Sequence, residues 1–163
     1  MGTLVIVESD AVTGTDKHNV QGDATNPGAP PPTIPYVGIG DYSYTGSMTD
    51  SLSDFVNIDG QPVATVGSKS SLDPGEDAFG GGHHGASGSN FIPPAPSPIA
   101  PTLSITDSVG EGTPSATAGS SFASVDGEAI LLNGDSIDTC DGLSVPMNST
   151  VAADNQDFVS CSE

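Results

Sequence analysis

The chain has 163 residues, a length that suits one domain. Its formal net charge is −19, because it has 21 acidic residues and only two basic ones, Lys17 and Lys69. This charge argues against nucleic acids and anionic membrane surfaces as partners, since both require clustered cations. Gly (21) and Pro (14) are frequent, whereas aromatic residues make up only 5%. We therefore expect a single all-β domain over residues 1–163 with a thin core and long Gly/Pro-rich loops.

In chain order, residues 3–8 (TLVIVE) predict a strand, and residues 9–35 are rich in turn formers and end in a run of prolines. Residues 36–52 carry Tyr36, Tyr42 and Tyr44 in an alternating stretch, which predicts one exposed strand. Residues 91–101 (FIPPAPSPIAP) hold five prolines, which favour an extended strap over a surface. The segment TLSIT at 102–106 is a further strand candidate.

A repeated unit is the most informative feature of the chain. Residues 53–68 (SDFVNIDGQPVATVGS) and 120–135 (SSFASVDGEAILLNGD) align without gaps and share a Ser, a Phe, an Asp-Gly pair and a later Gly. Asp-Gly between apolar residues is the strongest short signal for a tight hairpin turn, so each unit reads as strand, turn, strand. A partial third unit at 151–161 contains DFVSC, which matches DFVNI at 54–58 in three of five places. Three units predict three faces around one axis.

These units resemble PAAR-repeat proteins, in which a strand, an Asn/Asp-Gly turn and apolar residues precede Gly-Asp and a cysteine. The resemblance rests on FASVDGEAILLNGDSIDTC (122–140), on FVNIDGQPVATVGS (55–68) as a looser copy and on PTIPY (32–36). The alanine-arginine pair that usually follows the turn is absent here. The resemblance implies a small three-faced cone or prism of short β-strands.

The implied function is structural. Such a cone forms the tip of the central spike of a contractile injection system, either type VI or an extracellular phage-tail-like particle, and sharpens it for penetration of the target envelope. The resemblance implies a trimeric β-helical spike protein of the valine-glycine-repeat family as partner, with one cap per trimer; effector cargo is a further partner that this role admits. It also implies a structural zinc ion at the apex.

The candidate zinc ligands are His18, His83, His84 and Cys140, with Cys161 as a substitute; together they are all the histidines and cysteines of the chain. In the sequence, 65 residues separate His18 from His83 and 57 separate His83 from Cys140, which is close to the 67-residue spacing of the repeated units. Each of the three faces can therefore contribute one ligand. The ordinary alternative is that His83 and His84 belong to an exposed Gly-rich loop. A Cys140–Cys161 disulfide formed after export also stays open.

No common catalytic motif is present, so we expect a protein that is not an enzyme. Two other functions remain open: an acidic secreted adhesin or surface-binding β module, and a tail or capsid decoration protein that forms its own trimers. The chain opens without a signal-peptide pattern. We therefore expect synthesis in the cytoplasm; the resemblance implies assembly at the apex of an injection particle, after which the protein is ejected or extracellular.

Overall fold

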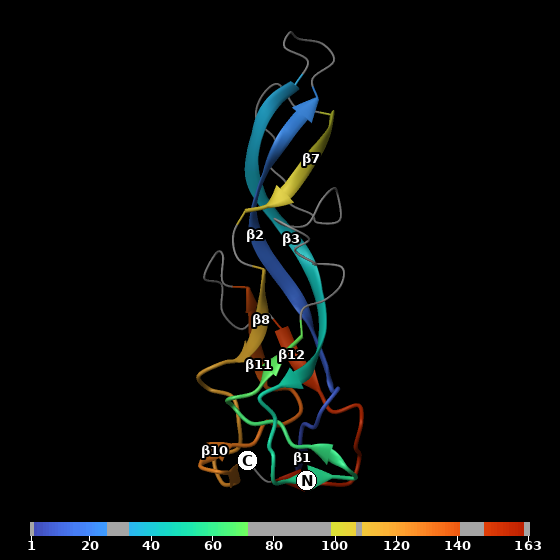
Figure 1. The fold of residues 1–163 in the computed structure, drawn as a ribbon, viewed down its shortest axis with the longest axis vertical. Helices are drawn as coiled ribbons and strands as arrows, with labels where there is room; N and C mark the ends of the chain where they lie inside the picture. The colour runs from blue at the N-terminus through green and yellow to red at the C-terminus, as the bar shows by residue number, and fades with distance from the viewer. Residues whose placement is uncertain (1, 26–32, 72–98, 107–108, 141–148, 162–163) are drawn as a thin grey trace.

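The computed structural model describes residues 2–25, 33–71, 99–106, 109–140 and 149–161. Within these ranges the chain forms strands, turns and irregular segments, without a helix, so the protein is all-β as predicted. No helix there is long and apolar enough to cross a membrane. Figure 1 shows a broad end, where both termini lie, and a long ribbon of strands that leads away from it.

Two tight hairpins form where the Asp-Gly pairs predict them. Strand β4 (Asn57–Ile58) pairs with β5 (Gln61–Pro62), and β9 (Ser124–Val125) pairs with β10 (Glu128–Ala129). Both turn residues have positive φ, 51° and 84° in the first hairpin and 54° and 88° in the second. Two successive positive φ angles define the turn that matches the twist of the flanking strands, and Asp-Gly adopts them at low cost.

A third hairpin is assembled from the two ends of the chain. Strand β1 (Thr3–Leu4) pairs antiparallel with β13 (Ser160–Cys161) in the register of the other two hairpins, but no turn joins the two strands. Residues 3–10 therefore occupy the place that residues 61–68 and 128–135 occupy in the other units. The third unit is complete in space although its two halves lie at opposite ends of the sequence.

The three units close around one axis through a ring of main-chain hydrogen bonds. The N–H of Ile6 donates to the carbonyl of Leu131 (3.0 Å), Leu131 donates to Ala64 (3.0 Å), and Ala64 donates to Ile6 (2.9 Å). Antiparallel bridges join the units in the same cyclic order: Val5↔Leu132, Thr65↔Ile130 and Val7↔Val63. This cycle gives the single chain an approximate threefold axis.

Six strands rise from the three units and form a nearly closed antiparallel sheet. Their order is β6 (Lys69–Ser70), β3 (Thr33–Asp50), β2 (Ala11–Thr25), β12 (Ser149–Ala152), β11 (Ser136–Cys140) and β8 (Val109–Pro114). In this order, the strands that lead into a unit (β3, β12 and β8) alternate with the strands that lead out of one (β2, β11 and β6). Three repeats of one motif require this alternation.

Contacts between β6 and β8 bring the two edges of this sheet together. The N–H of Gly112 donates to the Ser70 hydroxyl (3.0 Å), and Lys69 Nζ lies 3.0 Å from Glu111 Oε2. The hydrogen bond that Lys69 donates to Glu111, and then the negative charge of the Glu111 carboxylate, raise the pKa of Lys69 above the ordinary lysine value. Because this ion pair is exposed, the buried Ser70–Gly112 contact contributes more to closure than the charges do.

The long ribbon departs from the sequence-based expectation. Residues 11–25, predicted to be turn-rich, form β2 and pair with β3 without interruption from Ala11↔Ser47 to Thr25↔Thr33. Strand β7 (Ile99–Ile105) pairs with the far half of β2 and includes the last three residues of the predicted strap. Gly, Asn and Asp within β2 suggest turns locally, but the continuous ladder outweighs these preferences. Residues 91–98 of the strap lie outside the described residues.

The core is thin, as the composition predicts, and has two layers on either side of the hydrogen-bonded ring. One layer fills the base of the six-stranded sheet: Ile6, Val12, Tyr44, Met48, Ala64, Leu131, Ile137 and Val151. The other lies beneath the three hairpins: Val5, Val7, Ile58, Val63, Ile130 and Leu132. The ring thus separates a sheet core from a hairpin core, and both draw on all three units.

Candidate functional site: the threefold hairpin end

A rigid loop precedes each hairpin and is built in the same way three times. One side-chain oxygen accepts hydrogen bonds from the backbone N–H groups two and three residues further on, at 2.8–3.2 Å. The acceptors and their donors are Ser53 with Phe55 and Val56, Ser120 with Phe122 and Ala123, and Gln156 with Phe158 and Val159. These bonds fix the backbone of the loop and with it the position of each phenylalanine.

The phenylalanine of each loop faces solvent. Phe55 is 79% exposed, Phe122 is 77% exposed and Phe158 is 63% exposed. They are the large apolar side chains most exposed in the described part of the chain, with Val56 next at 40%. The sequence singles out the repeated Phe, but an aromatic beside a hairpin ordinarily packs inward, so its exposure was not predicted. The hairpin end therefore presents three aromatic rings in equivalent places around the axis.

The turn that ends each unit is also shared. The side chain of the last residue accepts a hydrogen bond from the N–H three residues earlier: Asp10 from Val7 (2.8 Å), Ser68 from Thr65 (2.9 Å) and Asp135 from Leu132 (2.8 Å). These bonds turn the chain from the hairpin into the rising strand.

Asp10 also ties the split unit together. Its Oδ1 accepts from the backbone N–H groups of Asp154 (2.8 Å) and Asn155 (2.9 Å) and from the Asn155 side-chain amide (3.0 Å). The Asp10 side chain is fully buried. A buried carboxylate requires such donors, and here they link residue 10 to residues 154–155 across the chain termini.

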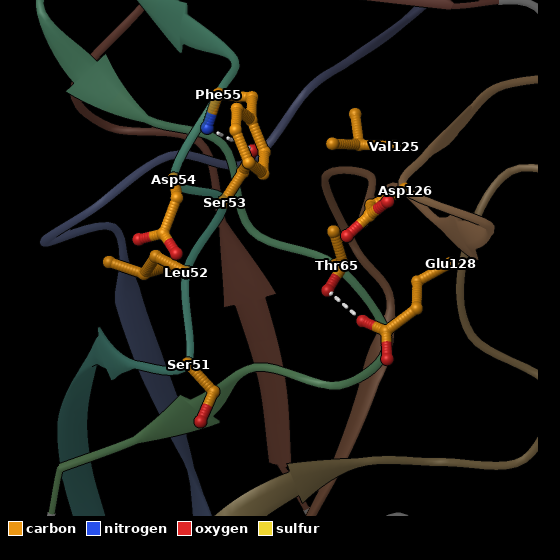
Figure 2. A pocket seen from close by; sticks show the side chains of 9 residues that line it. All are labelled: Ser51, Leu52, Ser53, Asp54, Phe55, Thr65, Val125, Asp126 and Glu128. Atoms are coloured by element: carbon orange, nitrogen blue, oxygen red, sulfur yellow. Dashed lines mark hydrogen bonds between the residues drawn. The ribbon is translucent and has the colours of Figure 1, made fainter.

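A shallow hollow of about 190 Å³ lies between the first and second units. Figure 2 shows Asp54 and Phe55 on one side and Val125, Asp126 and Glu128 on the other. Thr65 at its floor donates to Glu128 Oε2 (2.6 Å) and holds that carboxylate in place. The hollow therefore combines an exposed aromatic ring with three acidic side chains, an arrangement that suits a cationic side chain of a partner.

A second hollow, of about 310 Å³, lies beside the corresponding segment of the second unit. Its lining residues are Thr117, Gly119, Ser120, Ser121, Leu132 and Asp135. Ser121 stands where the first unit has Asp54, and Asp135 is engaged by the N–H groups of Leu132 and Gly119. The first and second faces thus share their backbone and their aromatic ring but differ in charge.

Two of the four predicted zinc ligands lie on described strands. His18 pairs with Gly40 in β2, and Cys140 ends β11 opposite Val109. Both strands meet the rung of Ser149, at Gly14 in β2 and at Ile137 in β11. His18 lies four residues beyond this rung and Cys140 three residues beyond it. The backbone therefore places them at a similar height above the hairpin end.

His83 and His84 lie outside the described residues. The structure therefore does not test whether the four predicted zinc ligands come together. Among the described residues, no three His, Cys, Asp or Glu side chains form a group that would hold a metal ion. The zinc site at His18, His83, His84 and Cys140 stays a prediction.

Cys161, the substitute ligand, has a different place. It is a free thiol in β13, opposite Thr3, and packs against the hairpin core. Ile58 and Val125 hold the same position in the other two hairpins, so Cys161 acts there as a small apolar residue. It lies at the hairpin end, whereas Cys140 lies at the far end of β11, on a strand that leads away from that end (Figure 1).

The geometry of the hairpin end suits binding to a surface. Its aromatic rings are exposed, its loops are fixed by hydrogen bonds, and the hollow between the first and second units is acidic. No protein-family model, no curated protein and no solved structure matches this chain.

Proposed function

We propose that this chain is the structural tip of the central spike of a contractile injection system, seated by its hairpin end on a trimeric β-helical spike. One observation carries the proposal: a single polypeptide closes three near-equivalent units around one axis through the Ile6–Leu131–Ala64 ring. A monomer with three faces can continue a trimer at its end, each face meeting one subunit. The resemblance of the Asp-Gly units to PAAR repeats supports the same function.

The shape of the molecule also supports this role. The broad hairpin end gives a seat, and β2 and β3 extend from it as a narrow ribbon (Figure 1). Fifteen residue pairs join these strands, which at about 3.4 Å per residue corresponds to roughly 50 Å of continuous ladder. A thrust along this direction is spread over many backbone hydrogen bonds.

A zinc ion would suit the ribbon side of the molecule. His18 and Cys140 reach a similar height on strands separated only by β12. A metal bound there would join two strands that do not pair with each other in the described register, and so would stiffen the part of the tip above the seat.

Stoichiometry tests the proposal most simply. Native mass spectrometry of the chain mixed with the trimeric β-helical spike protein of the same injection system is expected to show one 16.2 kDa cap on each trimer. The free chain is expected to sediment as a monomer. Three caps per trimer, or no complex, would contradict the proposal, and a stable homotrimer of the free chain would favour a decoration protein instead.

A further inference from the structure

The three exposed phenylalanines are not required by the fold. The core beneath the hairpins is filled by Val, Ile and Leu side chains, and the rings of Phe55, Phe122 and Phe158 remain mostly in solvent. A single exposed apolar side chain is common on protein surfaces and needs no explanation. Three rings at one repeated position are a different observation, because each is held by its own capped loop.

Comparison of the three units within the chain strengthens this point. The capping residue varies between Ser and Gln, and the central core residue of each unit is Ile, Ala or Leu. The phenylalanine position alone holds the same large side chain in all three units, although that side chain is mostly exposed in each. A role outside the fold, in contact with a partner, accounts for this pattern.

We propose that Phe55, Phe122 and Phe158 are the anchors by which the hairpin end docks, and that the partner offers three apolar sockets, with lysine or arginine beside those that receive Phe55 and Phe158. The inference rests on the proposed function and names the contact through which it would operate. Aromatic side chains at fixed positions are typical anchors of protein interfaces, because they bury a large area at low entropic cost. Rings placed around a pseudo-threefold axis fit sockets related by a true threefold axis.

The charge around the rings defines the rest of the partner surface. Asp54 and Asp157 directly precede Phe55 and Phe158, and Asp126 and Glu128 border the hollow beside Phe55 (Figure 2). A basic rim on the partner would complement these carboxylates and speed association. A second copy of this chain is disfavoured as the occupant, because both copies would carry a net charge of −19.

Binding of alanine variants to the trimeric spike protein tests the inference. Each single change, F55A, F122A or F158A, is expected to raise Kd about tenfold or more, and the triple variant is expected to lose detectable binding at micromolar concentration. Thr13→Ala and Thr113→Ala, exposed on β2 and β8, are matched controls and are expected to bind like the wild type. Since the rings are exposed, unfolding midpoints are expected to stay unchanged in all variants.

The acidic rim is tested separately. The double variant D54N/D157N is expected to bind several-fold more weakly at low salt and to show a shallower dependence of Kd on salt concentration. Glu111→Gln removes a carboxylate on β8 and is expected to leave this dependence unchanged.

The outcomes separate the two proposals. If the triple phenylalanine variant binds the trimer as the wild type does, the anchors are elsewhere and the cap function stands. If the wild-type chain binds no trimer, both proposals fail. If the free chain self-associates and the triple variant becomes monomeric, the rings form a contact between copies of this chain, and the docking inference is overturned.

Discussion

Asp10 provides a quantitative test of the split third unit. Its buried carboxylate accepts four hydrogen bonds, one from Val7 and three from residues 154–155. A hydrogen bond to a charged acceptor contributes about 1.5–3 kcal/mol. Asp154 and Asn155 are exposed, so water can satisfy part of what they lose, whereas the N–H of Val7 is buried. We therefore expect Asp10→Ala to lower the free energy of unfolding by about 3–5 kcal/mol.

The loss would be a large part of the stability of a domain this size, which is about 5–15 kcal/mol. Urea unfolding monitored by circular dichroism measures it, with Ser68→Ala as the matched control. Ser68 fills the equivalent place in the first unit but makes two hydrogen bonds, with Thr65 N–H and the Ser51 carbonyl. We expect that control to lose only about 1–2 kcal/mol. Equal losses in the two variants would refute the special role assigned to Asp10.

Three further predictions concern the hairpins and the cysteines. Gly60→Ala and Gly127→Ala introduce no steric clash, but each forces a side chain into positive φ and is expected to cost about 1–2 kcal/mol in urea unfolding; an unchanged midpoint would contradict the turn geometry. Cys161→Val is expected to leave both the stability and the metal content of the protein unchanged. Cys140→Ser is expected to lower the zinc content measured by elemental analysis, because Cys140 is the proposed ligand. Loss of zinc in the Cys161 variant would instead identify Cys161 as the ligand. Gln61→Met removes a buried side-chain oxygen that has no hydrogen-bond partner. Thermal unfolding of this variant is expected to show a stabilisation of about 1 kcal/mol. A clear destabilisation would contradict this prediction.

Local turn chemistry explains which parts of the fold could be predicted. The Asp-Gly pairs specify their hairpins within a few residues, and the repeated DFV motif marks the start of the third unit. The second half of that unit escaped prediction because it lies in residues 3–10, at the other end of the chain. The alignment of TLVIVESD with QPVATVGS and EAILLNGD, with apolar residues in the middle and a capping side chain at the end, is the signal that would have found it.

Non-local pairing explains the main departure from expectation. Strand β2 contains Gly14, Asn19 and Gly22, which locally favour turns, yet it pairs along its whole length with β3 and in part with β12 and β7. Sequence patterns describe a strand by its own residues, whereas this one is stabilised by neighbours on both edges. The exposure of the phenylalanines has the same origin, because whether an aromatic ring packs or faces solvent depends on which segments surround it.

The orientation proposed for the chain on a trimeric spike is measured most directly by electron cryo-microscopy of the assembled spike, reconstructed without imposed symmetry. We expect one chain on the threefold axis, with the three hairpins against the trimer and the β2–β3 ribbon pointing away. A reconstruction with the ribbon seated in the trimer, or with three copies of the chain around the axis, would contradict it.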